Sequence, residues 1–322
     1  MKQNSILVGS LIFSLLKVTF GQQQGQYSMY VVNQYLLNPG VTGTEDYADI
    51  KAGFRGQWVG LSDAPNSYYL TGHTPVGKHL GHKEHEGVKP LPWHSLGGMI
   101  NGENTGPLNK SGVYMSYAYH IPLRTDMNIS LGAFIGGQQY RVKTEQLRFD
   151  SRGGQDNVLT QNAIATSPDG SVGLWLYGKN VFTGISSLQV FNNKIDVSTG
   201  QEASRSRLNR HYFFTAGYRI KVDSNWSLVP SLMVKGIHPA PISVDLNCKV
   251  RYKDMLWGGF SWRNQDAVIV IVGFTWDKRW DIGYSYDYTT SRLGQYSSGT
   301  HEVVVGYRWH HLKHEPAPAQ FW

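Results

Sequence analysis

Apolar and polar residues alternate along most of the chain after Tyr47, and this alternation restricts the fold more than any other feature. In the stretch 241–252 one face carries Ile242, Val244, Leu246, Cys248, Val250 and Tyr252. The other face carries Ser243, Asp245, Asn247, Lys249 and Arg251. A period of two is the signature of a strand whose faces meet different surroundings. Charges opposite an apolar face predict an all-β fold, a transmembrane antiparallel β-barrel with its apolar side chains outward.

The first 21 residues have the layout of a secretory signal peptide. Lys2 precedes the apolar run 6–16, and small Gly21 precedes a Gln-rich stretch, so cleavage is expected between Gly21 and Gln22. The apolar run is shorter than the roughly 20 residues that a spanning helix needs. We therefore expect a signal peptide at 1–21, an N-terminal periplasmic or plug segment at 22–46, a barrel at 47–311 and a tail at 312–322.

Fourteen strands are expected, an even number that is typical of bacterial barrels with both termini in the periplasm. They are placed at 47–58, 66–75, 95–102, 111–121, 126–142, 170–177, 181–189, 211–222, 226–236, 241–252, 255–263, 266–276, 279–289 and 300–310. From the fourth strand on, every second connection is short, whereas Lys143–Gly170 and Phe191–Arg210 are long and polar. Short periplasmic turns and long outer loops are usual in such barrels. The long connection Gly77–His94 is the exception on the periplasmic side.

Aromatic residues at strand ends favour a membrane barrel over a soluble β-sandwich, which also alternates. Trp276 and Trp280 flank one short turn, Trp226 opens a strand and Trp309 closes the last one. Tryptophan at these positions matches the aromatic girdle at headgroup depth. The predicted inner face carries charges of both signs, at Arg219, Lys235, Asp245, Lys249, Arg251, Asp281, Asp287 and Arg308. These charges predict internal ion pairs, either with a plug or around a wide open pore.

The composition argues against several other functions. The formal net charge is +7, of which Lys2 and Lys17 contribute two, and the excess is dispersed, so nucleic acid is not an expected partner. The single Cys248 excludes an intrachain disulfide. The chain has no GxSxG motif and no spacing that singles out a catalytic triad. We expect no enzymatic activity, no catalytic residues and no cofactor.

Two histidine clusters have the composition of candidate metal sites. His79, His82 and His85 stand three apart, a spacing that could hold zinc or copper on a helix, but Gly81 and Gly87 disfavour a helix there. A solvated loop is the preferred interpretation. The second cluster, at His310, His311 and His314, is interpreted as interfacial or tail residues. No metal is expected at either place.

The two ends of the mature chain resemble the PorP/SprF family of outer-membrane proteins of type IX secretion systems. The N-terminal match is carried by Gln26, Tyr27, Ser28, Tyr30, Leu37, Asn38, Pro39 and Gly43, with Gly40 where the family usually has Ala. A second block matches at Arg55, Gln57, Trp58, Ala64 and Pro65. The C-terminal stretches include LVPSLMVKG, SVDLNCKVRYKDMLWGGFSW and IGYSYDYTTSRLGQYSSGTHEVVVGYRW. The tail LKHEPAPAQFW departs from the family, whose members usually stop soon after the last strand.

This resemblance implies a non-enzymatic barrel that helps to export, anchor or surface-present a large secreted protein such as an adhesin. It also implies contacts with the periplasmic ring and anchor components of the secretion system, besides outer-membrane lipid. The family-motif residues Tyr27, Tyr30, Asn38, Pro39, Arg55, Gln57 and Trp58 are candidates for partner docking. The segment before the first strand is either an ordered plug or a docking surface, and both roles are compatible. A porin-like diffusion channel is the alternative function, and a barrel enzyme a third.

Overall fold

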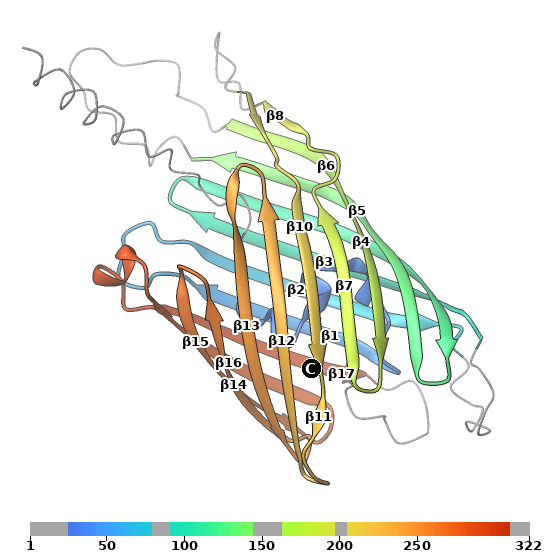
Figure 1. Cartoon of the computed structure of the whole chain (residues 1–322). Coiled ribbons are helices and arrows are strands. Elements are labelled where there is room, and N and C mark those ends of the chain that lie inside the picture. Colours follow the sequence, from blue (N-terminus) through green and yellow to red (C-terminus); the bar gives the residue numbers. More distant parts are fainter. Residues whose placement is uncertain (1–24, 79–90, 144–162, 197–204, 310–322) are drawn as a thin grey trace, which may run out of the picture.

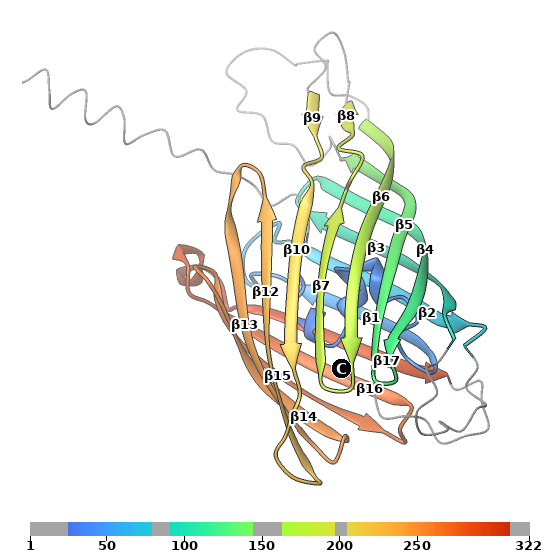
Figure 2. The same ribbon diagram turned by 45° about the vertical axis from the view of Figure 1, so that its right-hand side comes forward.

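The computed structural model describes residues 25–78, 91–143, 163–196 and 205–309, which form a closed antiparallel β-barrel (Figures 1 and 2). The predicted signal peptide at 1–21 and tail at 312–322 lie outside the described residues. So do His79, His82, His85, His310, His311 and His314. Their predicted roles stay predictions.

Most described residues belong to strands. Their bounds are β1 Ala48–Gly56, β2 Asn66–Val76, β3 Trp93–Thr105, β4 Leu108–Arg124, β5 Met127–Val142, β6 Ala163–Gly178, β7 Val181–Leu188, β8 Lys194–Asp196, β9 Arg205–Arg207, β10 His211–Tyr218, β11 Ile220–Lys221, β12 Trp226–Ile237, β13 Ala240–Tyr252, β14 Leu256–Arg263, β15 Ala267–Trp276, β16 Trp280–Thr289 and β17 Thr300–Trp309. Short 3₁₀ turns occur at η1 Met29–Val31, η2 Gln34–Leu36, η3 Pro39–Val41 and η6 Arg292–Gln295.

Each barrel strand pairs with its neighbours in the sequence, and the ring closes where β1 pairs with β17. Strands β10 and β11 are two parts of one strand, since both pair with β12 on either side of Arg219. The small β8–β9 hairpin pairs only within itself. The wall therefore has fourteen strand positions, and the fourteen predicted strands are confirmed with shifts of a few residues at most ends.

The largest boundary error concerns β6, which begins at Ala163 and not at residue 170. The sequence SPDG at 167–170 has turn composition, which predicts that these residues belong to the loop Lys143–Gly170. In the structure they extend the pairing with β5, from Gly137 opposite Pro168 to Val142 opposite Ala163. Pairing with β7 starts only at Val172. Pro168 therefore lies on a stretch paired along one side, where proline is tolerated.

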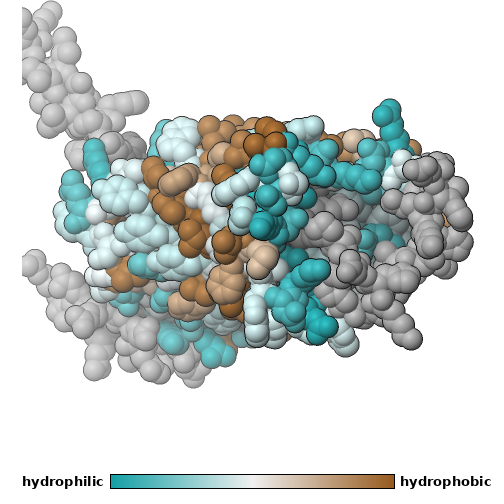
Figure 3. Space-filling model, turned by 90° about the horizontal axis from the view of Figure 1, so that it is seen from below, coloured by the Kyte–Doolittle hydropathy of each residue, from teal (hydrophilic) through white to brown (hydrophobic). Residues whose placement is uncertain are grey.

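The two faces of the wall are sorted as predicted. On β13, Asp245, Asn247, Lys249 and Arg251 are buried, whereas Ile242, Leu246 and Cys248 are exposed. On β16, Ser285 and Asp287 are buried and Tyr284 and Tyr288 are exposed. Seen from below, hydrophobic residues gather in patches beside hydrophilic ones (Figure 3). An apolar outer surface around a polar interior is the pattern of a membrane barrel.

The two ends of the barrel differ in their connections. At one end, called the turn end, short turns join β4–β5, β6–β7, β11–β12, β13–β14 and β15–β16. The opposite end, called the loop end, carries the connections β1–β2, β5–β6, β7–β10 and β16–β17 together with three short ones. Ala48 pairs with Trp309, so the barrel wall starts and finishes at the turn end.

Among the described residues, no helix has the length and apolar character needed to cross a membrane.

The sorting of faces predicts how the wall tolerates charge. Leu246 lies mid-strand on the outer face, so Leu246→Arg should lower the free energy of unfolding by about 2–4 kcal/mol in a bilayer. Leu256 lies at the turn end of β14, and Leu256→Arg should cost only about 0–1 kcal/mol. Equilibrium unfolding in liposomes measures both. Equal losses would contradict the outward placement of Leu246 in the apolar band.

Candidate functional site: the lumen and its N-terminal segment

The barrel lumen contains the chain's own N-terminal segment, Gly25–Glu45 (the short blue turns inside the wall in Figures 1 and 2). Every residue from Gln26 to Glu45 except Tyr27 is buried. Gly25 approaches Glu103 near the loop end, whereas Tyr47 leads into β1 at the turn end. The segment therefore runs the length of the lumen. Its first described residue lies at the opposite end from Trp309, although both termini are predicted to be periplasmic.

Ser28 is the centre of a buried charge network in the half of the lumen nearer the loop end. Its Oγ donates to the Asp287 carboxylate at 2.6 Å, and its backbone N–H donates to Glu302 Oε2 at 2.7 Å. Arg55 contacts the same two acids, with Nη2 2.7 Å from Asp287 and Nη1 3.1 Å from Glu302. One arginine from β1 thus neutralises acids from β16 and β17 and fixes the segment against them.

Further ion pairs confirm that the charges of the inner face compensate one another. Arg263 on β14 pairs with Asp245 on β13 at 3.0 Å, and both side chains are almost fully buried. Arg308 binds Asp281 through two nitrogens, each at 2.7 Å. Two parallel N–H···O bonds are the strong form of this pairing. Such pairs are expected where charge lies beside apolar surface, because an unpaired buried charge is very costly.

Asn38 and Pro39, both family-motif residues, hold the middle of the segment to the wall. Asn38 Nδ2 donates to the carbonyls of Leu174 on β6 and Ile185 on β7, at 3.0 and 3.2 Å. Asn38 Oδ1 accepts the N–H of Gly40 at 2.8 Å and caps the turn that starts at Pro39. The side chain therefore binds both strands of the β6–β7 pair and its own turn at once.

Three inward glycines give this turn its space. A Cβ at Gly173 would come within 2.0 Å of Asn38 Oδ1, and one at Gly132 within 2.2 Å of the Pro39 carbonyl oxygen. A Cβ at Gly184 would lie 2.8 Å from Asn38 Nδ2. These positions, on β5, β6 and β7, are where a second backbone approaches the sheet closely, which is a common reason for glycine inside a strand.

Near the turn end, aromatic and imidazole groups continue the contact. His120 Nε2 donates to the Thr42 carbonyl at 2.7 Å, and its ring stacks on Trp93 at 4.7 Å between centroids. The hydroxyls of Tyr35 and Ser116 share a hydrogen bond of 2.7 Å. Together with Asn38 and Ser28, these contacts attach the segment to β4, β6, β7, β16 and β17.

Burial shifts the ionisation of the segment's own acids and phenols. Desolvation, reinforced by the nearby charges of Asp49 and Asp46, raises the pKa of Glu45 to about 7. One of its oxygens, Oε1, has no hydrogen-bond partner in the structure. Desolvation likewise raises the pKa values of Tyr27, Tyr30 and Tyr35, which stay neutral at physiological pH.

The predicted site residues divide between two places. Tyr27, Tyr30, Asn38, Pro39 and Arg55 lie in the lumen, where Asn247 Nδ2 donates to the Tyr30 hydroxyl at 2.8 Å. Gln57 and Trp58 follow β1 at the loop end and are half-buried. The Trp58 N–H donates to Thr300 Oγ1 at 3.0 Å, which ties the β1–β2 connection to β17.

Sequence reasoning did not predict that Glu302, His120 and the three inward glycines contact the N-terminal segment. Alternation assigns a residue to the inner face, but it does not say which inward residues meet the segment. Glycines at inward positions were the available signal, since Gly132, Gly173 and Gly184 interrupt the inward side chains of three consecutive barrel strands. Among the described residues, no group of three or more His, Cys, Asp or Glu could hold a metal ion.

The charge network gives a first prediction for this site. Arg55→Met leaves Asp287 and Glu302 buried without their principal cation, so the free energy of unfolding should fall by about 3–5 kcal/mol. Arg141→Met removes an exposed arginine from β5 and should change stability by no more than about 0.5 kcal/mol. Denaturant unfolding of the two variants compares them. A similar small effect for both would show that the network contributes little.

A second prediction concerns pH. Because the pKa of Glu45 is raised in the folded protein, the folded state holds a proton that the unfolded state releases between about pH 4.5 and 7. The stability contributed by this group is therefore present below that window and declines as pH rises through it, by up to roughly 3 kcal/mol. Thermal unfolding at pH 5 and pH 8 should show a larger loss for the native protein than for Glu45→Gln. An unchanged pH difference in the variant would refute the assignment.

Comparisons with solved structures agree with the fold. A monoaromatic hydrocarbon channel, the TodX deltaS2S3 mutant, matches with a TM-score of 0.51 and 10% identity, over 89% of this chain and 95% of that one. The Ralstonia pickettii toluene transporter TbuX matches with a TM-score of 0.47 and 11% identity, over 85% of this chain and 92% of that one. The Acinetobacter baumannii outer membrane protein Omp33 matches with a TM-score of 0.45 and 8% identity, over 83% of this chain and 100% of that one. The match to the TodX variant, at 10% identity, indicates a shared barrel architecture and no more.

The sequence comparisons are more specific. No curated protein sequence matches the chain. The family model described as type IX secretion system membrane protein PorP/SprF matches residues 19–307, nearly the whole chain. This match and the barrel fold support an outer-membrane location. The chain belongs to the PorP/SprF family of type IX secretion system membrane proteins.

Proposed function

We propose that the protein is a non-enzymatic outer-membrane scaffold of the type IX secretion system that helps to export, anchor or surface-present a large secreted protein, such as an adhesin. The observation that carries this proposal is the occupied lumen. The buried segment Gln26–Glu45 is hydrogen-bonded to strands around the ring, so the interior is suited to rigidity more than to solute flow. In this proposal the segment acts as a plug.

The proposed partners bind at opposite ends of the barrel. The short connections of the turn end carry exposed charges of both signs, including Asp126, Lys221, Lys253 and Lys278. Such a surface suits periplasmic ring and anchor components if the turn end faces the periplasm, as in other barrels. The loop end, with Gln57 and Trp58, would then face the cell exterior and the exported protein.

A diffusion channel is the second candidate, because the structurally similar TodX variant and TbuX are described as a channel and a transporter. Those likenesses concern the fold. Within the described lumen, the segment fills the space along which a solute would pass, and this disfavours the channel.

Conductance in a planar bilayer separates the two functions. The native protein should show no steady pore. Gly132→Leu, whose side chain collides with the Pro39 carbonyl, should displace the segment and produce openings. Gly72→Leu is the matched control on β2, where a Cβ meets only Ile50 at 3.9 Å, and it should remain closed. A steady open pore in the native protein would overturn the scaffold in favour of the channel.

Native purification tests the partners. Extraction from the outer membrane, followed by mass spectrometry, should recover one large surface protein or periplasmic ring components with the barrel. Recovery of the barrel alone would count against the scaffold. A Gln57→Ala, Trp58→Ala double variant should reduce recovery of the surface protein while leaving the periplasmic components in place.

A further inference from the structure

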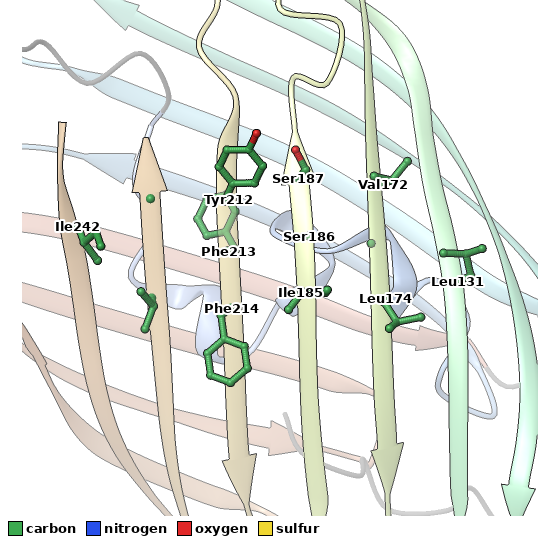
Figure 4. Close-up of a pocket in the computed structure, with 13 residues that line it drawn as sticks. Leu131, Val172, Leu174, Ile185, Ser186, Ser187, Tyr212, Phe213, Phe214 and Ile242 are labelled. Atoms are coloured by element: carbon green, nitrogen blue, oxygen red, sulfur yellow. The ribbon is translucent and has the colours of Figure 1, made fainter. Parts of the chain in front are cut away.

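The outer wall of the barrel carries a groove with a volume of about 530 Å³. It crosses β6, β7, β10 and β12, and Figure 4 shows the side chains around it. Leu131, Leu174, Ile185 and Ile242 border it, and all four are exposed on the outward face. None of the described residues that line the groove is charged. The volume lies within the range of about 300–1,000 Å³ that is usual for small-molecule sites.

Small residues widen the groove in the row of its lining that lies nearer the loop end. Val172, Ser187, Tyr212 and Gly236 lie side by side at one level of β6, β7, β10 and β12. Ser187 and Gly236 are the small members of this row, and a Cβ added at Gly236 would meet no atom within 4 Å. Met115 and Phe260, elsewhere on the outer wall, are large exposed side chains.

Of the three polar side chains in the lining, Ser186 donates to the Leu37 carbonyl in the lumen, and Tyr212 and Ser187 lie toward the loop end of the groove. The oxygens of Tyr212 and Ser187 point to that side in Figure 4. Just beyond them, Arg210 precedes β10 and is exposed. Its Nε donates to the Val190 carbonyl at 2.9 Å, two residues beyond the end of β7, so the guanidinium is tied to the loop-end side of the β7–β10 pair. The apolar groove is suited to an acyl chain, and a cation lies on its loop-end side.

From this arrangement we propose that the groove binds lipid A, the membrane anchor of lipopolysaccharide. An acyl chain fills the apolar groove beneath Tyr212, and a phosphate of the glucosamine headgroup meets Arg210, whose planar guanidinium suits phosphate. The commitment to lipid A follows from the position of the cation. With the loop end outside, as proposed above, Arg210 lies at the outer leaflet, which is built of lipopolysaccharide.

The binding is tested by native mass spectrometry of the full-length barrel in mild detergent, titrated with purified lipid A. The native protein should retain one lipid A. Gly236→Phe fills the groove and should abolish retention, whereas Gly72→Phe, on the opposite side of the ring, should bind like the native protein. Arg210→Ala should weaken binding roughly tenfold, the loss expected for one charge-assisted hydrogen bond.

Several results would overturn the proposal. Retention of lipid A by Gly236→Phe, unchanged affinity in Arg210→Ala, or equal binding of phosphatidylethanolamine would each contradict a specific lipid A site. If Gly236→Phe does not assemble, Ser187→Trp fills the same groove from β7 and takes its place. The bilayer conductance and the co-purified proteins do not depend on these variants, so failure here leaves the proposed scaffold separately testable.

Discussion

Every polar group of the backbone must find a partner inside the protein wherever the chain crosses lipid, and the rest of this structure depends on that requirement. A sheet meets it only by closing on itself, because an open edge would leave N–H and C=O groups in hydrocarbon. Closure here joins β1 to β17 and encloses an interior that the wall alone does not fill. The N-terminal segment occupies that interior and provides partners for the inward charges, as Ser28 does for Asp287 and Glu302.

The wall was largely predictable from the sequence, since alternation reports directly on which face a side chain occupies. From Asp245 to Arg251 on β13, and on β16, the buried residues lie on the predicted inner face and the exposed ones on the predicted outer face, whereas Ser243 and Val244 are both half-buried. The start of β6 was missed because Ser-Pro-Asp-Gly has the composition of a turn, while its pairing with β5 is set by a partner strand distant in sequence. The local composition there favours a turn, but pairing with β5 holds these residues in a strand.

The interior was far less predictable. Inward charges pointed to ion pairs, which the structure contains, but the sequence could not say that Arg55 serves two acids more than 230 residues away. Motif residues identified Asn38 and Pro39 through a family resemblance, and only the structure connects them to the backbone of β6 and β7. Strands β6 and β7 also line the outer groove. The same part of the wall therefore binds the N-terminal segment on its inner face and forms the groove on its outer face.

The path of the segment has a consequence for assembly. Asn38 is bound by β6 and β7, whereas Ser28 is bound by β16 and β17 near the other end of the chain. The segment can therefore become fully buried only after the last strands have joined the ring. A barrel that stops short leaves the Ser28 end without its acids. Complete burial of Ser28 therefore requires that β16 and β17 have already paired in the barrel wall.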